Sequence, residues 1–583
     1  MTLILVAAMI LLPWAGALFV WAAGNERPRL QNGLAVTFSV AAGICGLAML
    51  PRAGAEVVLN FPVGGAFGDF TFVADGLGVF LAAVATVIGS LAVIFSVDYM
   101  KGEHQLGRYY AMVLFFIGAM VGLVLTSNLL LMFFFWEITA LCSYALISFN
   151  NDDPKAVAGG MKALIITQLG GIGLLVGALV LYAYTGSYDI QALIANPAIV
   201  PAGVLAWMAF GGLAAAAAKS AQFPFQTWLP DAMEAPTPIS ALIHAATMVN
   251  AGVYLLARFY PAFHGVPGWT TAVTLVGLVT ALLAALMALV ANDLKRVLAY
   301  STVSQLGYMV YAVGVGGIYA SQFHLLSHSV FKALLFLSAG AVIHAVGTRD
   351  MRQMGGLGKQ MPLTRAVFII GSLALAGIPI LNGFWSKELV LEAGLMHGPM
   401  WAYVGMLIGA GLTAFYTYRM VTMVFYGSPR SALHGHDAGP AMRVALIPLA
   451  FGALTTWLLA GPFSRLLSVE SLPMHHIEPE NTWVILEEVF SLPTLIALLV
   501  VALGLVCWWQ RERLAGLGQA LKGIGWAAEH SFGFEAVNRA IVGGTQKLGE
   551  ALRVTQTGWL NWNVFGILAG LVVVLIVVIL GGR

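Results

Sequence analysis

Charged residues are scarce in this sequence. Only 9% of its 583 residues are Asp, Glu, Lys or Arg, whereas 60% are hydrophobic. Soluble domains carry about 25% charged residues, so the composition excludes an ordinary soluble protein. It predicts a polytopic membrane protein embedded in a lipid bilayer, and the formal net charge of +2 gives no reason to expect a nucleic-acid partner.

Cysteines and cofactor signatures are also scarce. The three cysteines, Cys45, Cys142 and Cys507, lie far apart in apolar runs, without the spacing of a metal site or a disulfide framework. The sequence has no nucleotide-binding loop, no GxSxG motif and no haem or iron–sulfur signature. We therefore expect no cofactor and no bound metal, and we interpret HGHD at 434–437 as a solvated loop.

Long apolar runs, in contrast, fill the chain. About sixteen of them are long enough to cross a bilayer, which takes about 20 residues. They lie near residues 2–23, 32–50, 76–98, 109–127, 128–149, 157–183, 203–228, 237–258, 269–291, 297–316, 321–345, 363–396, 402–426, 442–461, 491–509 and 563–581. The seventh run is interrupted at Pro224, and the twelfth at Pro379 and Gly383. The first has no basic segment before it, so we expect a retained span rather than a signal peptide.

The basic residues are distributed unequally between the predicted loops. With the N-terminus outside, most of the 28 Lys and Arg residues lie on the inner side. Only Arg52, Arg258, Arg465 and Arg583 lie on the outer side. Because basic loops remain in the cytoplasm, we predict a protein of the inner (cytoplasmic) membrane with both termini outside.

Three basic residues that no loop accounts for, Lys219, Lys332 and Lys387, and one central carboxylate, Glu137, lie inside predicted spans. A charge at membrane depth costs several kcal/mol unless it is paired or hydrated, so each is a functional candidate. Lys219 precedes the break at Pro224, where a missing N–H leaves backbone carbonyls free. Lys387 follows the second break, and paired broken helices mark ion pathways in transporters. The alternatives are a neutral Glu137 that hydrogen-bonds two helices, and simple kinks with lysines that reach the interface.

Three ionisable residues on one predicted span, two of them histidines, favour proton transfer. His324, His328 and Lys332 are spaced by four residues, which places them on one helix face over roughly 12 Å. Imidazoles accept and donate protons near neutral pH, so we predict a proton relay. His244 and His344 are isolated and are weaker candidates. Since sodium prefers several oxygen ligands and this set is mostly nitrogen, protons are favoured over sodium.

The order of the motifs resembles a known family. The motifs are FFFWEITALCSYALISF, AAKSAQFPFQTWLPDAMEAPTPISALIHAATMVNAGVYLLARF, NDLKRVLAYSTVSQLGYM, FHLLSHSVFKALLFLSAGAVIH, MGGLGKQMPLT and NGFWSKELVL. Over nearly its whole length the chain is similar to the antiporter-like subunits shared by respiratory complex I and Mrp-type sodium/proton antiporters. It is most similar to the L subunit of NADH-quinone oxidoreductase.

The resemblance implies an all-α fold of about sixteen transmembrane helices. Two inverted five-helix repeats, each with one broken helix, would form two half-channels. The implied parts are spans 1–3 at 1–108, the repeats at 109–258 and 269–426, spans 14–15 at 427–509, an amphipathic cytoplasmic segment at 510–562 and an anchor span at 563–583. The complete path would comprise Glu137, Lys219, His244, His324, His328, Lys332 and Lys387.

By the same resemblance each path residue has a role. Glu137 and Lys219 would form the ion pair of the first half-channel, and His244 would connect it to the central Lys332. His324 and His328 would lie on the central polar axis, which leads to the terminal lysine of the second half-channel. Such subunits hold no redox centre, and they move protons when a partner module carries out a redox reaction.

The chain departs from its relatives at three places. Gly171 replaces the aspartate usual in the sixth span of L subunits, and Asn250 replaces the lysine of Mrp subunits. The segment 531–557 takes the place of a long lateral helix but reaches only about 40 Å, so we expect it to contact one adjacent subunit. Its apolar residues Phe534, Val537, Ile541, Leu548 and Leu552 recur at helical spacing. A helix on the membrane surface is the alternative.

Three functions follow from these patterns. The first is a proton-translocating subunit of a complex I-like complex, partnered by other membrane subunits. The second is a subunit of an Mrp-type antiporter that exchanges sodium for protons. The third is an ion-coupled subunit that drives a partner, such as a protein of inorganic carbon uptake.

Overall fold

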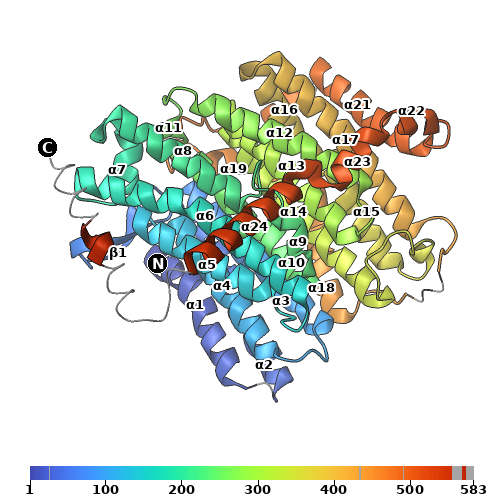
Figure 1. Cartoon of the computed structure of the whole chain (residues 1–583), viewed down its shortest axis with the longest axis horizontal. Coiled ribbons are helices and arrows are strands. Elements are labelled where there is room, and N and C mark those ends of the chain that lie inside the picture. The colour runs from blue at the N-terminus through green and yellow to red at the C-terminus, as the bar shows by residue number, and fades with distance from the viewer. Residues whose placement is uncertain (25, 432, 434, 490, 554–567, 573–583) are drawn as a thin grey trace. The chain divides into compact units, whose positions relative to one another are not determined.

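The computed structural model describes residues 1–24, 26–431, 433, 435–489, 491–553 and 568–572 (Figure 1). The chain divides into two compact units, Met1–Gly525 and Trp526–Arg583. Almost all described elements are helices, and the strands β1 (Val57–Phe61) and β2 (Phe70–Val73) form one antiparallel hairpin. The all-α membrane fold expected from the sequence is confirmed.

The helices follow one another with short connections. In the N-terminal part they are α1 (Thr2–Ala22), α2 (Pro28–Met49), α3 (Gly76–Tyr99), α4 (Leu106–Leu125), α5 (Leu129–Ile147), α6 (Pro154–Thr185), α7 (Ile190–Ala195), α8 (Ala202–Lys219), α9 (Trp228–Asp231), α10 (Thr237–Ala241) and α11 (Met248–Phe263). They continue with α12 (Trp269–Val290), α13 (Leu294–Gly314), α14 (Ile318–Val346), α15 (Pro362–Ala376), α16 (Asn382–His397), α17 (Met400–Phe425), α18 (Pro440–Thr455), α19 (Ala460–Leu466), α20 (Thr482–Val489), α21 (Leu492–Trp509), α22 (Ala515–Ala520), α23 (Lys522–Glu529) and α24 (Phe534–Arg553).

Among the described residues, 13 helical segments are long and apolar enough to cross a membrane. The predicted span at 297–316 corresponds to α13, whose polar residues keep it out of that set although the helix is largely buried. The predicted span at 363–396 is divided into α15 and α16, and the last, at 563–581, lies largely outside the described residues. The hairpin of β1 and β2 was not expected from the sequence.

The first helix break follows Lys219, as the sequence predicts. The helix α8 ends at Lys219, and carbonyl groups of its last turn that lack a helical N–H partner accept hydrogen bonds from residues further along the chain. Gln222 donates its backbone N–H to the Ala217 carbonyl at 2.7 Å, and the Trp228 indole donates to the Ala218 carbonyl at 2.9 Å. Because these bonds satisfy the backbone internally, an interrupted helix is tolerated at membrane depth.

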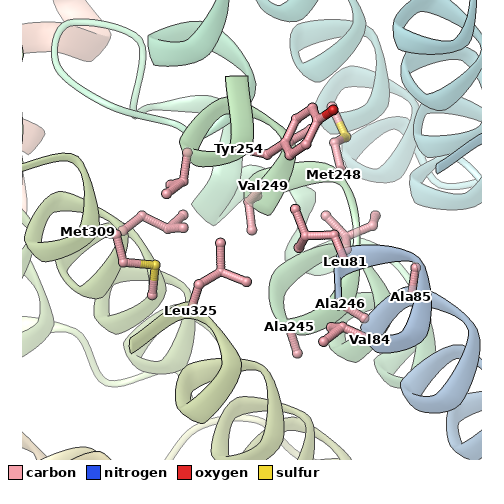
Figure 2. Packing of buried hydrophobic residues seen from close by; sticks show 14 of the residues in the cluster. Leu81, Val84, Ala85, Ala245, Ala246, Met248, Val249, Tyr254, Met309 and Leu325 are labelled. Atoms are coloured by element: carbon pink, nitrogen blue, oxygen red, sulfur yellow. The ribbon is translucent and has the colours of Figure 1, made fainter. Parts of the chain in front are cut away.

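A widened helical turn precedes α11. Leu242–Ala246 form a π turn, and the Thr247 hydroxyl donates to the Leu242 carbonyl at 2.8 Å. Figure 2 shows Ala245 and Ala246 of this turn packed among side chains of α3, α13 and α14. Such turns are frequent at functional sites, and this one carries His244.

The second break separates α15 from α16. Gly377 ends α15 with a φ of +81°, a conformation that other residues adopt only at a cost. A Cβ atom at Gly383 would lie 1.9 Å from the Ala374 carbonyl oxygen, so only glycine allows α16 to begin so close to α15. The sequence prediction of an interruption near Pro379 and Gly383 is confirmed.

Ion pairs tie the two halves of the chain together at the face that carries most of the basic loops. Asp231, after the first break, accepts from Lys162 of α6 at 2.8 Å and from Arg296 of α13 at 3.1 Å. Arg349 contacts Glu234 at 3.0 Å and Asp293 at 3.1 Å. These contacts connect α6 of the first predicted repeat to α13 of the second.

At the opposite end of the bundle, Arg258 and Asp75 form a buried bidentate ion pair. The Tyr254 hydroxyl accepts from the guanidinium at 3.1 Å. Arg258 was expected on the outer side, as the last residue of the span 237–258, and α11 continues beyond it to Phe263. A buried charge pair is destabilising unless it is fully hydrogen-bonded, and here both groups have partners.

Candidate proton path

The three lysines of the predicted path are fully buried or nearly so, with exposed fractions of 0% for Lys219, 0% for Lys332 and 2% for Lys387. Lys219 Nζ donates to the Trp136 carbonyl at 2.7 Å, and Lys387 Nζ donates to the Leu375 carbonyl at 2.7 Å. Burial of an amine without partners is costly, so these carbonyls hold the side chains in place. Each amine can bind or release a proton at a fixed position.

Glu137 lies on α5, one residue after the carbonyl that holds Lys219. Its carboxylate lies close enough to Lys219 for the two groups to interact electrostatically. No ion pair within 4 Å joins Glu137 to Lys219 in the part of the chain that the structure describes. The Trp136 ring lies 4.9 Å from Lys219 Nζ. The predicted pair is thus adjacent but not in direct contact.

Gly171 of α6 faces the Glu137 carboxylate. A Cβ atom at this position would lie 2.6 Å from Glu137 Oε1. That oxygen has no hydrogen-bond partner among the described residues. The glycine therefore leaves room for the carboxylate on the surface of α6.

The histidine ladder lies along α14, and all of its members are buried. The ring centroids of His324 and His328 are 6.4 Å apart. Lys332 Nζ donates to the Ser301 hydroxyl at 2.6 Å and lies 3.3 Å from the Leu298 carbonyl. The three groups lie along one helix as the spacing predicts, and α13 supplies hydrogen-bond partners to Lys332 and, through Gln305, to His324.

Polar contacts lead from the ladder to the second break. His324 Nδ1 lies 2.9 Å from the Ser386 hydroxyl, and its Nε2 lies 3.1 Å from Gln305 Oε1. Ser386 is directly followed by Lys387. His328, His324 and Ser386 therefore lie in a row between Lys332 and the start of α16, although His328 has no hydrogen-bond partner among the described residues.

His244 lies against the ladder helix: its ring centroid is 4.8 Å from that of Phe336, which is one turn after Lys332 on α14. Asn250 of α11 donates to the Ala245 carbonyl at 2.8 Å and to Ser329 of α14 at 3.3 Å. The π turn thus brings His244 and Asn250 against the ladder helix.

Sequence reasoning missed several residues of this region. Glu388 of α16 is buried, with an exposed fraction of 7%. In the sequence Glu388 directly follows Lys387, inside the predicted span 363–396. A carboxylate at that position could have been recognised as a candidate. Gln305 and Ser301 carried no signal, since single polar residues on α13 do not reveal which helix they face.

Two weaker candidates lie elsewhere. His344 stacks near Tyr99 and His436, with ring centroids 5.4 Å and 5.9 Å away, and none of the described contacts connects it to the ladder. Asp437 of HGHD accepts from the backbone N–H groups of Leu363 and Thr364 at 2.8 and 3.1 Å. It therefore caps the first turn of α15.

Two family models match the chain. The model described as NADH:quinone oxidoreductase/Mrp antiporter, transmembrane region, matches residues 126–413. The model described as NADH-ubiquinone oxidoreductase (complex I), chain 5 N-terminus, matches residues 61–110. The first match contains all seven residues of the predicted path.

Three curated relatives match this chain with similar sequence identity and over similar shares of its length. NAD(P)H-quinone oxidoreductase chain 5 of Synechocystis is 44% identical over 398 residues, which cover 65% of this chain and 58% of the relative. The F(420)H(2) dehydrogenase subunit L of Methanosarcina mazei is 43% identical over 426 residues, 65% of this chain and 63% of the relative. Subunit L of NADH-quinone oxidoreductase from Pseudomonas aeruginosa is 44% identical, with 67% and 65% covered. The chain spans less than two thirds of the length of these relatives.

Two solved structures have a similar fold. The Mrp complex from Dietzia superposes with a TM-score of 0.82 and 28% identity, covering 98% of this chain and 63% of that one. The membrane-bound sulfane sulfur reductase, an archaeal respiratory complex, gives a TM-score of 0.72 and 25% identity, with 81% and 98% covered.

The fold and the buried lysines define an antiporter-like membrane protein. This class is consistent with the interrupted helices, with the ladder on α14 and with the family matches. The chain belongs to the family of complex I chain 5/L-like antiporter subunits.

Proposed function

We propose that this chain translocates protons as a membrane subunit of a complex I-like energy-converting complex. The observation that carries the proposal is the row of three buried amines, at Lys219, Lys332 and Lys387, connected by imidazole, amide and hydroxyl groups. The chain supplies no redox centre in this proposal. A partner module provides the energy, in keeping with the names of the relatives, which are subunits of quinone oxidoreductases and of a dehydrogenase.

The Glu137–Lys219 pair acts as the switch of the first half-channel. A carboxylate beside a buried lysine favours the charged lysine, and its withdrawal favours the neutral one. In this structure the two side chains interact without a direct ion pair, while Trp136 holds the amine. Movement of Glu137 toward Lys219 therefore loads a proton, and movement away from it releases the proton.

The released proton passes through His244 to Lys332, and then along the ladder to Lys387. Neither ring nitrogen of His244 or His328 has a hydrogen-bond partner among the described residues. Buried polar groups of this kind are normally satisfied by water, which would also carry the proton between them. Glu388, beside Lys387, is the acceptor at the end of the path.

The proposed setting follows from the same family. The protein lies in the cytoplasmic membrane with both termini outside, and residues 109–258 and 269–426 form the two inverted repeats. Residues 531–557 contact a neighbouring subunit. Protons are the proposed ion, and sodium is the alternative.

The test is proton pumping by the intact complex in inverted membrane vesicles, driven by its electron donor. Lys219→Ala and Glu137→Gln should each abolish pumping while the complex still assembles, because the switch loses one charged partner. Lys332→Ala should do the same, since it interrupts the path at its centre. Lys359→Ala, at an exposed loop position, is the matched control and should pump normally. Normal pumping by the Lys219 or Glu137 variants would refute the assigned path.

A second candidate function is sodium/proton exchange in an Mrp-type antiporter. It is favoured by the TM-score of 0.82 to the Mrp complex over 98% of this chain. Gly171 also agrees with the Mrp A subunit. The two functions differ in their requirement for sodium, because an exchanger acidifies or alkalinises vesicles only in response to a sodium gradient. Pumping driven by an electron donor without sodium would exclude the exchanger.

A further inference from the structure

A groove lies between α15, α17 and α21, on a side of the bundle that the proposed path does not use. Its walls include Ile369, Leu373 and Ala376 of α15, Val421 of α17 and Leu505 of α21. It encloses about 370 Å³ and is lined mainly by apolar atoms. All three helices belong to the unit Met1–Gly525, and α17 contacts both of the others (Figure 1).

The groove is about as long as one membrane leaflet is thick. It begins at Ala376, beside the helix break, and reaches Tyr426, directly after the end of α17. On α17 its lining residues run from Thr417 to Tyr426, which is about 13 Å at 1.5 Å per residue. Half of a hydrocarbon core is about 15 Å thick. An apolar groove of this length and depth matches one lipid acyl chain.

Two arginines lie at the end of the groove where α15 begins and α21 ends. Arg365 lies one helical turn before Ile369, and therefore on the same face of α15. On the other side, the Trp508 indole donates to Thr422, which lines the groove, at 2.8 Å. The Arg511 guanidinium lies 4.7 Å from the Trp508 ring centroid.

The charges of these arginines are largely uncompensated. Arg365 forms no ion pair among the described residues, and Arg511 has only the exposed Glu512, at 3.8 Å. Arg513 adds a third positive charge on the same segment. Basic residues at a membrane surface attract anionic lipid headgroups, and tryptophan and tyrosine favour the headgroup level. Trp508 and Tyr426 provide both aromatic groups here.

We propose that this groove binds one anionic phospholipid, with an acyl chain between α15 and α17 and the headgroup at Arg365 and Arg511. The acyl chain would pack on Ala376, whose neighbour Leu375 accepts the hydrogen bond of Lys387. The lipid therefore covers the bilayer side of the helix turn that holds the terminal lysine. By the predicted orientation it belongs to the cytoplasmic leaflet.

The test compares two photoactivatable lipids in vesicles that contain the intact complex. Phosphatidylglycerol and phosphatidylcholine, each with a diazirine in one acyl chain, are added at equal mole fractions, and labelled peptides are identified by mass spectrometry. Phosphatidylglycerol should label the segments 362–376 and 400–426 more strongly than phosphatidylcholine does. Equal labelling by both lipids would overturn the proposal, because it would indicate only the ordinary surrounding lipid.

Variants separate the headgroup from the acyl chain. The double variant Arg365→Gln, Arg511→Gln should lower labelling by phosphatidylglycerol about tenfold and leave phosphatidylcholine unchanged. Leu373→Trp should abolish labelling in the groove by both lipids, because the indole fills it. The controls are Arg52→Gln, at the opposite face, and Leu499→Trp, on α21 two turns before Leu505, where the side chain is exposed.

A second measurement tests whether protein covers the groove instead. A photo-crosslinking amino acid at position 373 should capture lipid in the intact complex. A crosslink to another subunit would overturn the proposal, because the groove would then be a protein interface. Loss of pumping in the Lys219 variants would bear on the proposed function alone and not on this site.

Discussion

Individual residues of the path are held by backbone carbonyls rather than by carboxylates. Lys219 donates to the Trp136 carbonyl of α5, and Lys387 donates to the Leu375 carbonyl of α15. A carbonyl dipole fixes the position of the amine but, unlike a full negative charge, does not lock it in the charged form. This arrangement suits a group that must repeatedly gain and lose a proton.

Gly171 gives a test at the level of a single methyl group. Gly171→Ala would introduce a Cβ atom 2.6 Å from Glu137 Oε1, so the carboxylate must move. We expect proton pumping to fall at least about tenfold, because displacements near 1 Å in a reacting pair have effects of this size or larger. Pumping is measured in inverted vesicles.

The matched control for this change is Gly177→Ala on the same helix. A Cβ atom there would meet nothing within 4 Å. Both changes raise helix propensity by about 1 kcal/mol, so a difference between them cannot come from helix stability. Equal pumping rates would show that the close approach of Gly171 to Glu137 has no role.

At the level of helices, the sequence predicts both breaks and the ladder, because proline, glycine and the four-residue spacing have strong local effects on helical backbone. It does not predict Gln305, Ser386 or Glu388 as partners, since these contacts depend on how α13, α14 and α16 pack. The π turn at Leu242–Ala246 was also missed, because no residue type specifies it. Local signals identified the charged groups, while tertiary packing determined their partners.

The hydrogen bonds that Asp437 accepts at the start of α15 predict that the stability of this helix depends on pH. Burial raises the pKa of Asp437, but hydrogen bonds from Thr364, Leu363 and Ala438 outweigh this effect and lower it. A carboxylate with a lowered pKa stabilises the fold above its unfolded-state pKa, and this contribution is lost as pH falls through the lower folded-state value. The effect should therefore be complete at neutral pH and disappear in acid.

The measurement is hydrogen exchange at the first turn of α15 in the purified complex. Asp437→Ala should destabilise that turn by about 1 kcal/mol at neutral pH, the usual value for a helix N-cap. The difference from the wild type should vanish in acid. Asp152→Ala, at an exposed loop carboxylate, serves as the control and should leave exchange in α15 unchanged. A difference that persists in acid would contradict the role of the charged cap.

At the level of the whole chain, the unit Trp526–Arg583 contains the amphipathic helix α24. Val537, Ile541 and Leu548 on this helix are 55%, 62% and 60% exposed within the chain. If this face contacts a neighbouring subunit, Val537→Glu with Ile541→Glu should sharply reduce the amount of that subunit that co-purifies. Gln546→Glu, at an exposed polar position, is the control. Undiminished co-purification would favour a helix that lies on the membrane surface.

The hydroxyl of Ser386 links the protonation of His324 to the backbone of α16. Gln305 Oε1 can only accept, so Nε2 of His324 carries hydrogen, and neutral His324 needs a donor at Nδ1. Ser386 is the group at Nδ1, at 2.9 Å, yet its hydroxyl also lies 3.0 Å from the Asn382 carbonyl. One hydroxyl hydrogen cannot serve both acceptors. We expect this hydrogen to point to His324 while the ring is neutral, and to turn to the Asn382 carbonyl if the ring gains a second proton. A single serine hydroxyl would then couple the protonation of His324 to the first turn of α16, directly beside Lys387.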